Sequence, residues 1–97
     1  MEQINKISLP ECCTYYNIEA GFLQQLGDHG LLQFFSYEEE SYLTHDQLAD
    51  LEKYIHFYYE LNINMEGMEA IKHLLGRILQ LQQELKQYRA QQVYAGE

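Results

Sequence analysis

Hydrophobic residues recur at helical spacing in the first thirty residues and predict two short helices. Ser8 and Glu11 form a capping-box pattern, in which the hydroxyl and the carboxylate bind free amides at a helix start, so one helix should run to about Tyr16. A second helix should begin at Asn17 and end near Gly30, because glycine is favoured just past a helix end. Phe22, Leu23 and Leu26 should share one face of this second helix, with Ile18 leading into it.

The pattern changes after Gly30 to short aromatic-rich stretches on either side of three glutamates. Residues 31–37 and 41–43 predict two strands joined by an acidic turn, although no Asn-Gly or Asp-Gly pair supports this hairpin. Thr44 and Gln47 form a second capping-box pattern, which opens a helix that should end near Leu61. The apolar positions of this helix are spaced by three and four residues: Leu48, Leu51, Ile55 and Tyr58.

The last third of the chain predicts one long helix, which Asn64 can cap. Leu75 and Leu79 widen the first part of its apolar stripe, so we expect that part to pack on the rest of the domain. The stripe continues with the three- and four-residue spacing of a coiled-coil seam, formed by Ile71, Leu74, Ile78, Leu81, Leu85 and Tyr88.

This seam has two interpretations, which are core packing against the chain's own third helix and self-association. Residues 76–93 would span roughly 27 Å at 1.5 Å per residue, which is longer than so small a body can cover. Isolated helices of this length are marginal in water. We therefore expect a two-fold homodimer that forms through the seam or the adjoining helix faces.

The order of these elements, with several short motifs, resembles MerR-type winged-helix domains. Residues 28–32 resemble the Gly-Leu-Leu exit from the second helix of that family, and residues 42–44 resemble its return strand. The resemblance implies a mainly α fold, a MerR-like winged helix-turn-helix with a small β-hairpin and a long C-terminal helix. Residues 1–61 would form the winged-helix domain, and residues 62–97 the C-terminal helix for packing and dimerisation.

A narrower resemblance is to the CbpM-like chaperone modulators. Residues 60–71 are similar to the helix junction of that group, and residues 74–78 and 81–85 also match it, so the resemblance covers about residues 7–90. It implies a protein that binds and inhibits the J-domain of a DnaJ-like co-chaperone of the CbpA type and thereby blocks its action on DnaK. It assigns no individual contact residue.

The charge of the chain favours a basic protein partner over DNA. The net charge is −9, and the first 47 residues contain eight acidic residues and one lysine. Neither residues 19–29 nor residues 33–44 contain Lys or Arg. Because non-specific DNA affinity comes largely from cations that neutralise phosphates, we do not expect nucleic acid binding. A MerR-like DNA-binding transcriptional regulator is the alternative, and a dimeric adaptor for an unrelated basic partner is a third possibility.

Charge and helix faces also suggest which residues contact the partner. The three consecutive glutamates can be a binding surface or simply a solvated turn, and the tyrosines can be core or exposed contacts. The expected partner-binding residues are Glu38, Glu39, Glu40, Asp46 and Asp50 as acidic contacts and Tyr54 and Tyr58 as apolar ones.

Motifs for catalysis, cofactors or metals are missing from the sequence. There is no glycine-rich phosphate loop and no paired His or Cys spacing, so we expect a protein that is not an enzyme and needs no cofactor or metal. The adjacent Cys12 and Cys13 should be reduced and structural. No apolar run is long enough to span a membrane and no leader pattern follows Met1, so we expect a cytoplasmic protein with no membrane partner.

Overall fold

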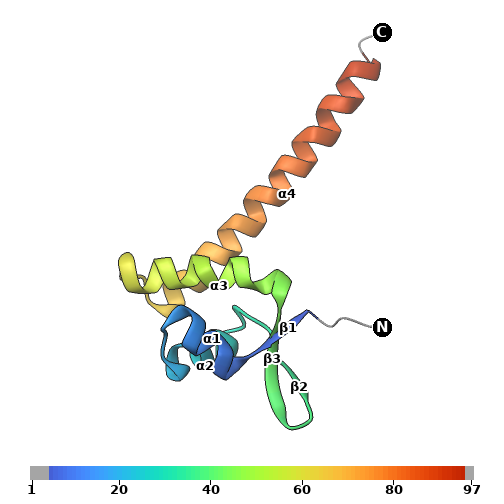
Figure 1. The fold of residues 1–97 in the computed structure, drawn as a ribbon. Helices are drawn as coiled ribbons and strands as arrows, with labels where there is room; N and C mark the ends of the chain where they lie inside the picture. The colour runs from blue at the N-terminus through green and yellow to red at the C-terminus, as the bar shows by residue number, and fades with distance from the viewer. Residues whose placement is uncertain (1–4, 96–97) are drawn as a thin grey trace.

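Figure 1 shows the computed structural model, which describes residues 5–95. A small head (residues 5–64) contains three short helices and a sheet, and one long helix leaves it. The predicted mainly α fold is confirmed. The elements in chain order are β1 (Lys6–Ser8), α1 (Leu9–Tyr16), α2 (Ala20–Asp28), β2 (Phe35–Tyr37), β3 (Glu40–Thr44), the 3-10 turn η1 (His45–Gln47), α3 (Leu48–Ile55), the π-helical turn η2 (His56–Glu60) and α4 (Met65–Ala95).

The capping box at the start of α1 is confirmed. The backbone amide of Glu11 donates to Ser8 Oγ at 3.2 Å, and the amide of Ser8 donates to Glu11 Oε1 at 3.0 Å. The start of α2 was predicted wrongly, because Asn17 ends α1 instead of opening the next helix. Asn17 has a left-handed backbone (φ 56°), a conformation that its short polar side chain tolerates, and α2 begins only at Ala20.

The core lies between α1, α2 and α3 and includes the predicted face of α2. Tyr54 of α3 is 2% exposed and Leu51 is fully buried. Two methionines from the first turn of α4 close this core. The buried apolar residues are Cys12, Ile18, Phe22, Leu23, Leu26, Leu31, Leu32, Leu43, Leu51, Tyr54, Met65 and Met68.

The predicted hairpin is part of a three-stranded antiparallel sheet with the strand order β1-β3-β2. The pairing of Ile7 with Leu43 directs one face of the sheet toward the core, where Leu43 is fully buried. The prediction lacked β1 because three residues are too few to show an alternating pattern.

The second capping box does not form as predicted. Thr44 precedes η1, and its side chain caps no helix amide. The side-chain amide of Gln47 instead binds the backbone of Gln33 and also donates to Thr44 Oγ1 at 3.2 Å. The helical region that follows ends at Glu60, close to the predicted end at Leu61.

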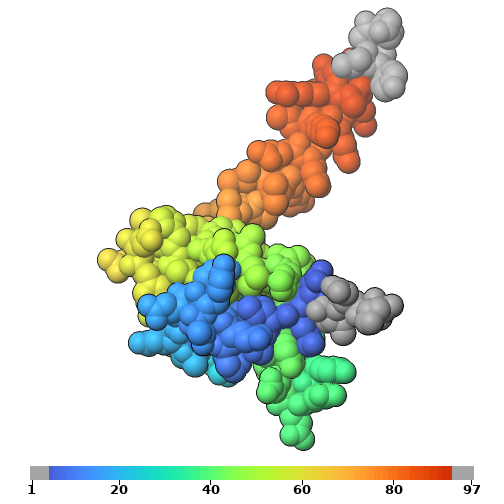
Figure 2. All heavy atoms as spheres, in the orientation of Figure 1, coloured from blue at the N-terminus to red at the C-terminus, as the bar shows by residue number. Residues whose placement is uncertain are grey.

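The long helix α4 is capped as predicted, since the Gly67 amide donates to Asn64 Oδ1 at 2.8 Å. Leu75 and Leu79 do not pack on the head as expected, because they are 39% and 61% exposed. The radius of gyration is 18.0 Å, whereas a compact chain of this length has about 12–13 Å, so α4 projects freely (Figures 1 and 2). Within residues 5–95, no helix combines the length and the apolar character needed to cross a bilayer.

Candidate functional site

The acidic turn forms the tip of the β2–β3 hairpin, which we call the wing (residues 35–44) and which extends from the head (Figures 1 and 2). Glu38 and Glu39 both have left-handed backbones, with φ of 51° and 68°. Two-residue hairpin turns of this kind favour Asn-Gly, and each non-glycine residue in a left-handed conformation costs about 1–2 kcal/mol. The chain therefore keeps two carboxylates at the tip at the expense of backbone stability.

One face of the wing is aromatic and points away from the core. Phe35 pairs with Tyr42 across the strands, and the centroids of their stacked rings are 5.8 Å apart. Tyr37, 49% exposed, has its ring centroid 6.5 Å from that of Tyr42. We call Phe35, Tyr37 and Tyr42 the aromatic face; the sequence prediction missed it, since the alternating aromatic positions gave no cross-strand register.

Carboxylates flank the aromatic face. The Tyr42 hydroxyl donates to Glu40 Oε1 at 3.4 Å, and partial desolvation followed by the charge of Glu40 raises the pKa of Tyr42 above its usual value. At the other end of β3, Asp46 and Asp50 line an open groove of about 440 Å³ together with Phe35. A five-residue strand is roughly 15 Å long. The predicted acidic contacts thus form two groups, the glutamates at the wing tip and the aspartates in the groove, and Phe35 belongs to both the groove and the aromatic face.

The acidic residues of the groove keep most of their charge available. Asp46 and Asp50 are both exposed. Asp50 Oδ1 lies 3.5 Å from Lys53 Nζ, and such exposed pairs contribute about 0–1 kcal/mol. The pair with Lys53 therefore hinders a partner's cation little at Asp50, but Lys72 of α4 also lines the groove and offsets part of its negative charge.

The two predicted tyrosine contacts do not lie at this surface. Tyr54 belongs to the core, and its burial, followed by the charge of Asp50, raises its pKa, so the prediction that it contacts a partner is wrong. Tyr58 is 36% exposed, but its ring packs on Phe22 with centroids 4.7 Å apart. Tyr58 lies in η2, at the opposite end of the α3 region from Asp46, so it cannot share a contact with the wing.

The predicted dimerisation seam is exposed over almost its whole length. Ile71 is half-buried next to the head, and the remaining seam residues face solvent in the single chain. This is a long apolar stripe with no partner among residues 5–92. The exposed fractions are 58% for Leu74, 48% for Ile78, 50% for Leu81, 47% for Leu85 and 59% for Tyr88.

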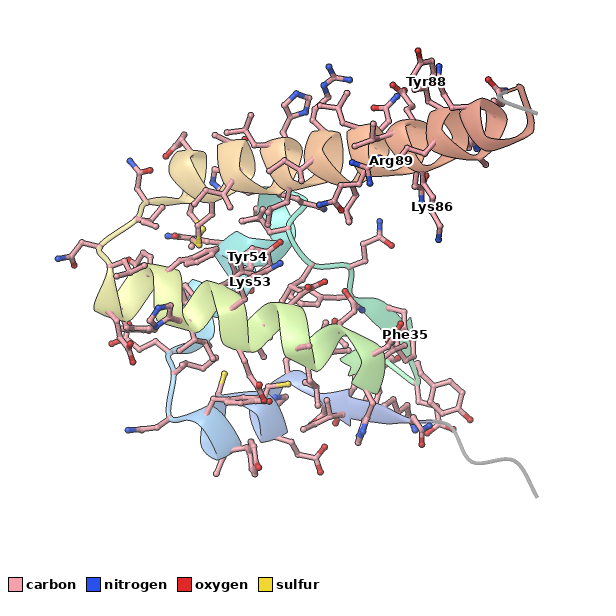
Figure 3. All side chains as sticks on the ribbon, turned by 90° about the horizontal axis from the view of Figure 1, so that it is seen from above. Phe35, Lys53, Tyr54, Lys86, Tyr88 and Arg89 are labelled. Carbon is pink, nitrogen blue, oxygen red and sulfur yellow. The ribbon has the colours of Figure 1, made fainter. Side chains whose placement is uncertain are left out.

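Charge is divided sharply between the head and the long helix. Residues 1–64 contain eleven acidic and two basic residues, a net charge of −9, whereas residues 65–97 contain four of each. Lys72 and Arg77 line a groove beside His29, and Lys72 Nζ donates to the carbonyl of Gly30 at 2.9 Å. Farther along α4, the side chain of Lys86 points to the side of the helix opposite Tyr88, and Arg89 lies between the two (Figure 3). The excess of negative charge therefore lies in the head, whereas the acidic and basic residues of the C-terminal third balance each other.

The reactive side chains of the described residues are scattered. Across residues 5–95, no three His, Cys, Asp or Glu side chains lie close enough together to hold a metal ion. Cys12 and Cys13 are free thiols, and burial, followed by the charges of Cys13 and Glu11, raises the pKa of Cys12 to about 11. The side chains of His29 and Glu69 contact each other and tie the end of α2 to α4. Among the described residues, the acidic wing tip and the groove beside Asp46 are therefore the features that remain as a candidate site.

The architecture agrees with a known family of regulators. Residues 7–90 match the family model described as MerR HTH family regulatory protein. No curated protein and no solved structure matches the chain. The family match extends from β1 to the distal part of α4 and so covers the head, the wing and most of the long helix. The chain therefore belongs to the MerR helix-turn-helix (HTH) family of regulatory proteins.

Proposed function

We propose that this chain is a cytoplasmic chaperone modulator, which binds and inhibits the J-domain of a DnaJ-like co-chaperone of the CbpA type and so blocks its action on DnaK. The resemblance of residues 60–71 to the CbpM-like helix junction supports this choice within the MerR family. The observation that carries the proposal is the charge of the head, which is −9 over residues 1–64. A basic protein surface complements this charge.

Electrostatics explains why a protein partner is favoured over a duplex. The expected reading helix, α2, contains neither Lys nor Arg, and the wing contains three glutamates. Phosphates within about 8 Å of these carboxylates would be repelled at physiological salt. The same field attracts a cationic protein, speeds its association and discriminates against acidic competitors. The proposed contacts are the wing glutamates and the groove formed around Asp46 and Asp50.

The proposed active form is a homodimer joined along α4. The apolar stripe from Leu74 to Tyr88 is exposed in the single chain, and a solvent-exposed helix of this length is marginal in water. Two copies that pair these stripes would bury them in a coiled-coil seam. The wing would remain free, because it leaves the head far from the distal part of α4 (Figure 1).

The direct test is calorimetric titration of the full chain with the J-domain proteins of the same organism at low salt. We expect binding that weakens as salt rises, and loss of affinity in the double variant Glu38→Gln and Glu39→Gln. The double variant Glu66→Gln and Glu84→Gln removes the same charge from α4 and should bind as the parent does. Failure of every J-domain protein to bind at low salt would reject the proposal.

A MerR-like DNA-binding regulator is the second candidate, because the family match is to regulatory proteins with a helix-turn-helix. In this case the basic side chains that contact DNA phosphates would have to come from α4. Lys72 and Arg77 lie near the head, and Lys86 and Arg89 lie farther out. A gel shift with genomic fragments at low ionic strength tests this candidate. Retardation at micromolar protein that is lost in Lys72→Met and Arg77→Met variants would favour it over the chaperone modulator.

A further inference from the structure

The aromatic face of the wing already holds a cation. Lys6 Nζ lies 4.8 Å from the ring centroid of Tyr42 and 5.3 Å from that of Tyr37. Both distances are within the roughly 6 Å over which an ammonium group interacts with the face of an aromatic ring. Lys6 is also the one basic residue among the first 47, so the single cation of this region occupies the aromatic face.

The strand register explains how these groups come together. Ser8 of β1 and Phe35 of β2 are both opposite Tyr42 of β3, so the three side chains share one face of the sheet. Lys6 lies two residues before Ser8, and Tyr37 two residues after Phe35, which places both on the same face. Glu40 is opposite Tyr37 and adds a carboxylate there.

We propose that the aromatic face is a recognition site for an arginine or lysine side chain of the basic partner, and that Lys6 fills this site in the free protein. The inference rests on the proposed function only in taking the partner to be a basic protein. Two tyrosine rings, a phenylalanine ring and flanking carboxylates provide both the π-surface and the negative charge that a cationic side chain prefers.

A basic side chain of the partner can replace Lys6 on the aromatic face. Tyr37 is half exposed, Lys6 is half-buried on the edge strand β1, and its ammonium is held by no ion pair within residues 5–95. A partner arginine has a planar guanidinium that stacks on rings better than an ammonium does, so it can replace Lys6. Occupation by Lys6 lowers the apparent affinity for the partner, because only the fraction of molecules with an open site can bind.

A matched pair of lysine variants tests this inference. Lys53 also lies over a tyrosine ring, with its Nζ 5.7 Å from the centroid of Tyr54, but that ring is in the core and not on the wing. Lys6→Met and Lys53→Met therefore remove the same charge and the same type of ring contact, and Lys53→Met in addition frees Asp50 from an exposed ion pair that contributes about 0–1 kcal/mol. The probe is a blocked tetra-arginine peptide, and its binding to the full-length chain is followed by the NMR shifts of the tyrosine rings.

We expect Lys6→Met to bind the peptide about two- to fivefold more tightly than Lys53→Met. Tyr37→Leu, at an exposed position, should weaken binding by a similar factor, whereas Tyr42→Phe should retain it because the ring remains. Equal affinities for the two lysine variants, or no effect of Tyr37→Leu in a protein whose circular dichroism is unchanged, would overturn the inference.

Titration of the same variants with a J-domain protein separates this inference from the proposed function. Peptide binding at the wing without J-domain binding would reject the proposed function and leave the cation site intact. J-domain binding that is equal in the Lys6→Met and Lys53→Met variants and unaffected by Tyr37→Leu would reject the cation site and leave the proposed function intact.

Discussion

The side-chain amide of Gln47 forms two hydrogen bonds with the backbone of Gln33, one in each direction. Gln47 Oε1 accepts from the Gln33 amide at 2.8 Å, and Gln47 Nε2 donates to the Gln33 carbonyl at 2.8 Å. A side chain thus takes the place that a neighbouring strand would occupy. This contact fixes the loop before the wing to the turn that begins α3, and so sets the width of the groove beside Asp46.

Removing this clamp should loosen the wing. We expect Gln47→Ala to lower the free energy of unfolding by about 1–2 kcal/mol, because two backbone groups lose their partner. Gln47→Glu should cost at least as much, since a carboxylate cannot donate to the Gln33 carbonyl. Urea unfolding measures both variants, and Gln24→Ala on the exposed side of α2 is the control. A Gln47→Ala variant as stable as this control would contradict the assigned role.

Substitutions at the wing tip should raise the stability of the protein and weaken its binding to a basic partner. Replacing Glu38 with Asn and Glu39 with Gly relieves two left-handed non-glycine positions, and we expect a gain of about 1–2 kcal/mol. For a domain of this size, 1 kcal/mol corresponds to about 4–8 °C in the melting temperature. The same change should weaken binding of a basic partner, because two carboxylates are lost.

The control variant keeps non-glycine residues with a left-handed backbone at positions 38 and 39 and removes only their charge. The double variant Glu38→Gln and Glu39→Gln should melt close to the parent and bind as weakly as the Asn-Gly variant. Differential scanning calorimetry and titration of the same samples separate the two effects. A glutamine variant that gains as much stability as the Asn-Gly variant would show that charge repulsion, and not backbone conformation, destabilises the turn.

Self-association should depend on the distal seam of α4. Leu81→Glu places one charge from each subunit in the proposed interface, and we expect at least a tenfold weaker dimer. Gln83→Glu adds the same charge on the opposite side of the helix and should leave the dimer intact. Light scattering over a concentration series measures both variants, and a chain truncated after Leu75 should be monomeric. An unchanged dimer in that truncated chain would place the interface elsewhere.

Stability should fall at alkaline pH through Cys12. Its pKa is raised from 9.0 to about 11, so the unfolded chain releases this proton at lower pH than the folded chain. The contribution of Cys12 is therefore complete below pH 9 and is lost as the pH rises toward 11, by about 2–3 kcal/mol in total.

Replacing Cys12 with Val keeps an apolar side chain of similar size and removes the titration. The difference in unfolding free energy between the parent and Cys12→Val should shift against the parent between pH 9 and pH 11. The ionisation of the other tyrosines occurs in both proteins and cancels, whereas Tyr16, whose pKa is raised by burial, by Glu52 and in part by Cys12, adds to the difference in the same pH range. Parallel pH profiles would show that the buried thiol does not titrate with folding.

Local rules predicted the helix starts that have local partners. Ser8 with Glu11 and Asn64 with Gly67 are contacts within three residues, so the sequence alone contains both partners. The Thr44–Gln47 pair has the same pattern, but Gln47 binds Gln33, which lies 14 residues away. A non-local partner of this kind is invisible to a spacing rule.

The sequence identified the acidic residues of the candidate site but not the positions of its aromatic side chains. Asp46 and Asp50 line one groove at the start of α3, whereas the three glutamates lie at the far end of the hairpin, and their roles as contacts remain predictions. Tyr54 was misplaced because helical spacing shows which residues share a face and not which face meets the core. The role of Lys6 required the register of β1, a strand of three residues.

The wing and α4 leave the head at opposite ends (Figure 1), which bears on how many partners one assembly can hold. A dimer joined along α4 would present two wings that do not obstruct each other. A partner that carries two basic modules on one flexible tether could engage both wings, and the second attachment would be intramolecular, at an effective concentration on the order of millimolar. Splitting the dimer would then shorten the residence time of such a partner even though each wing is unaltered.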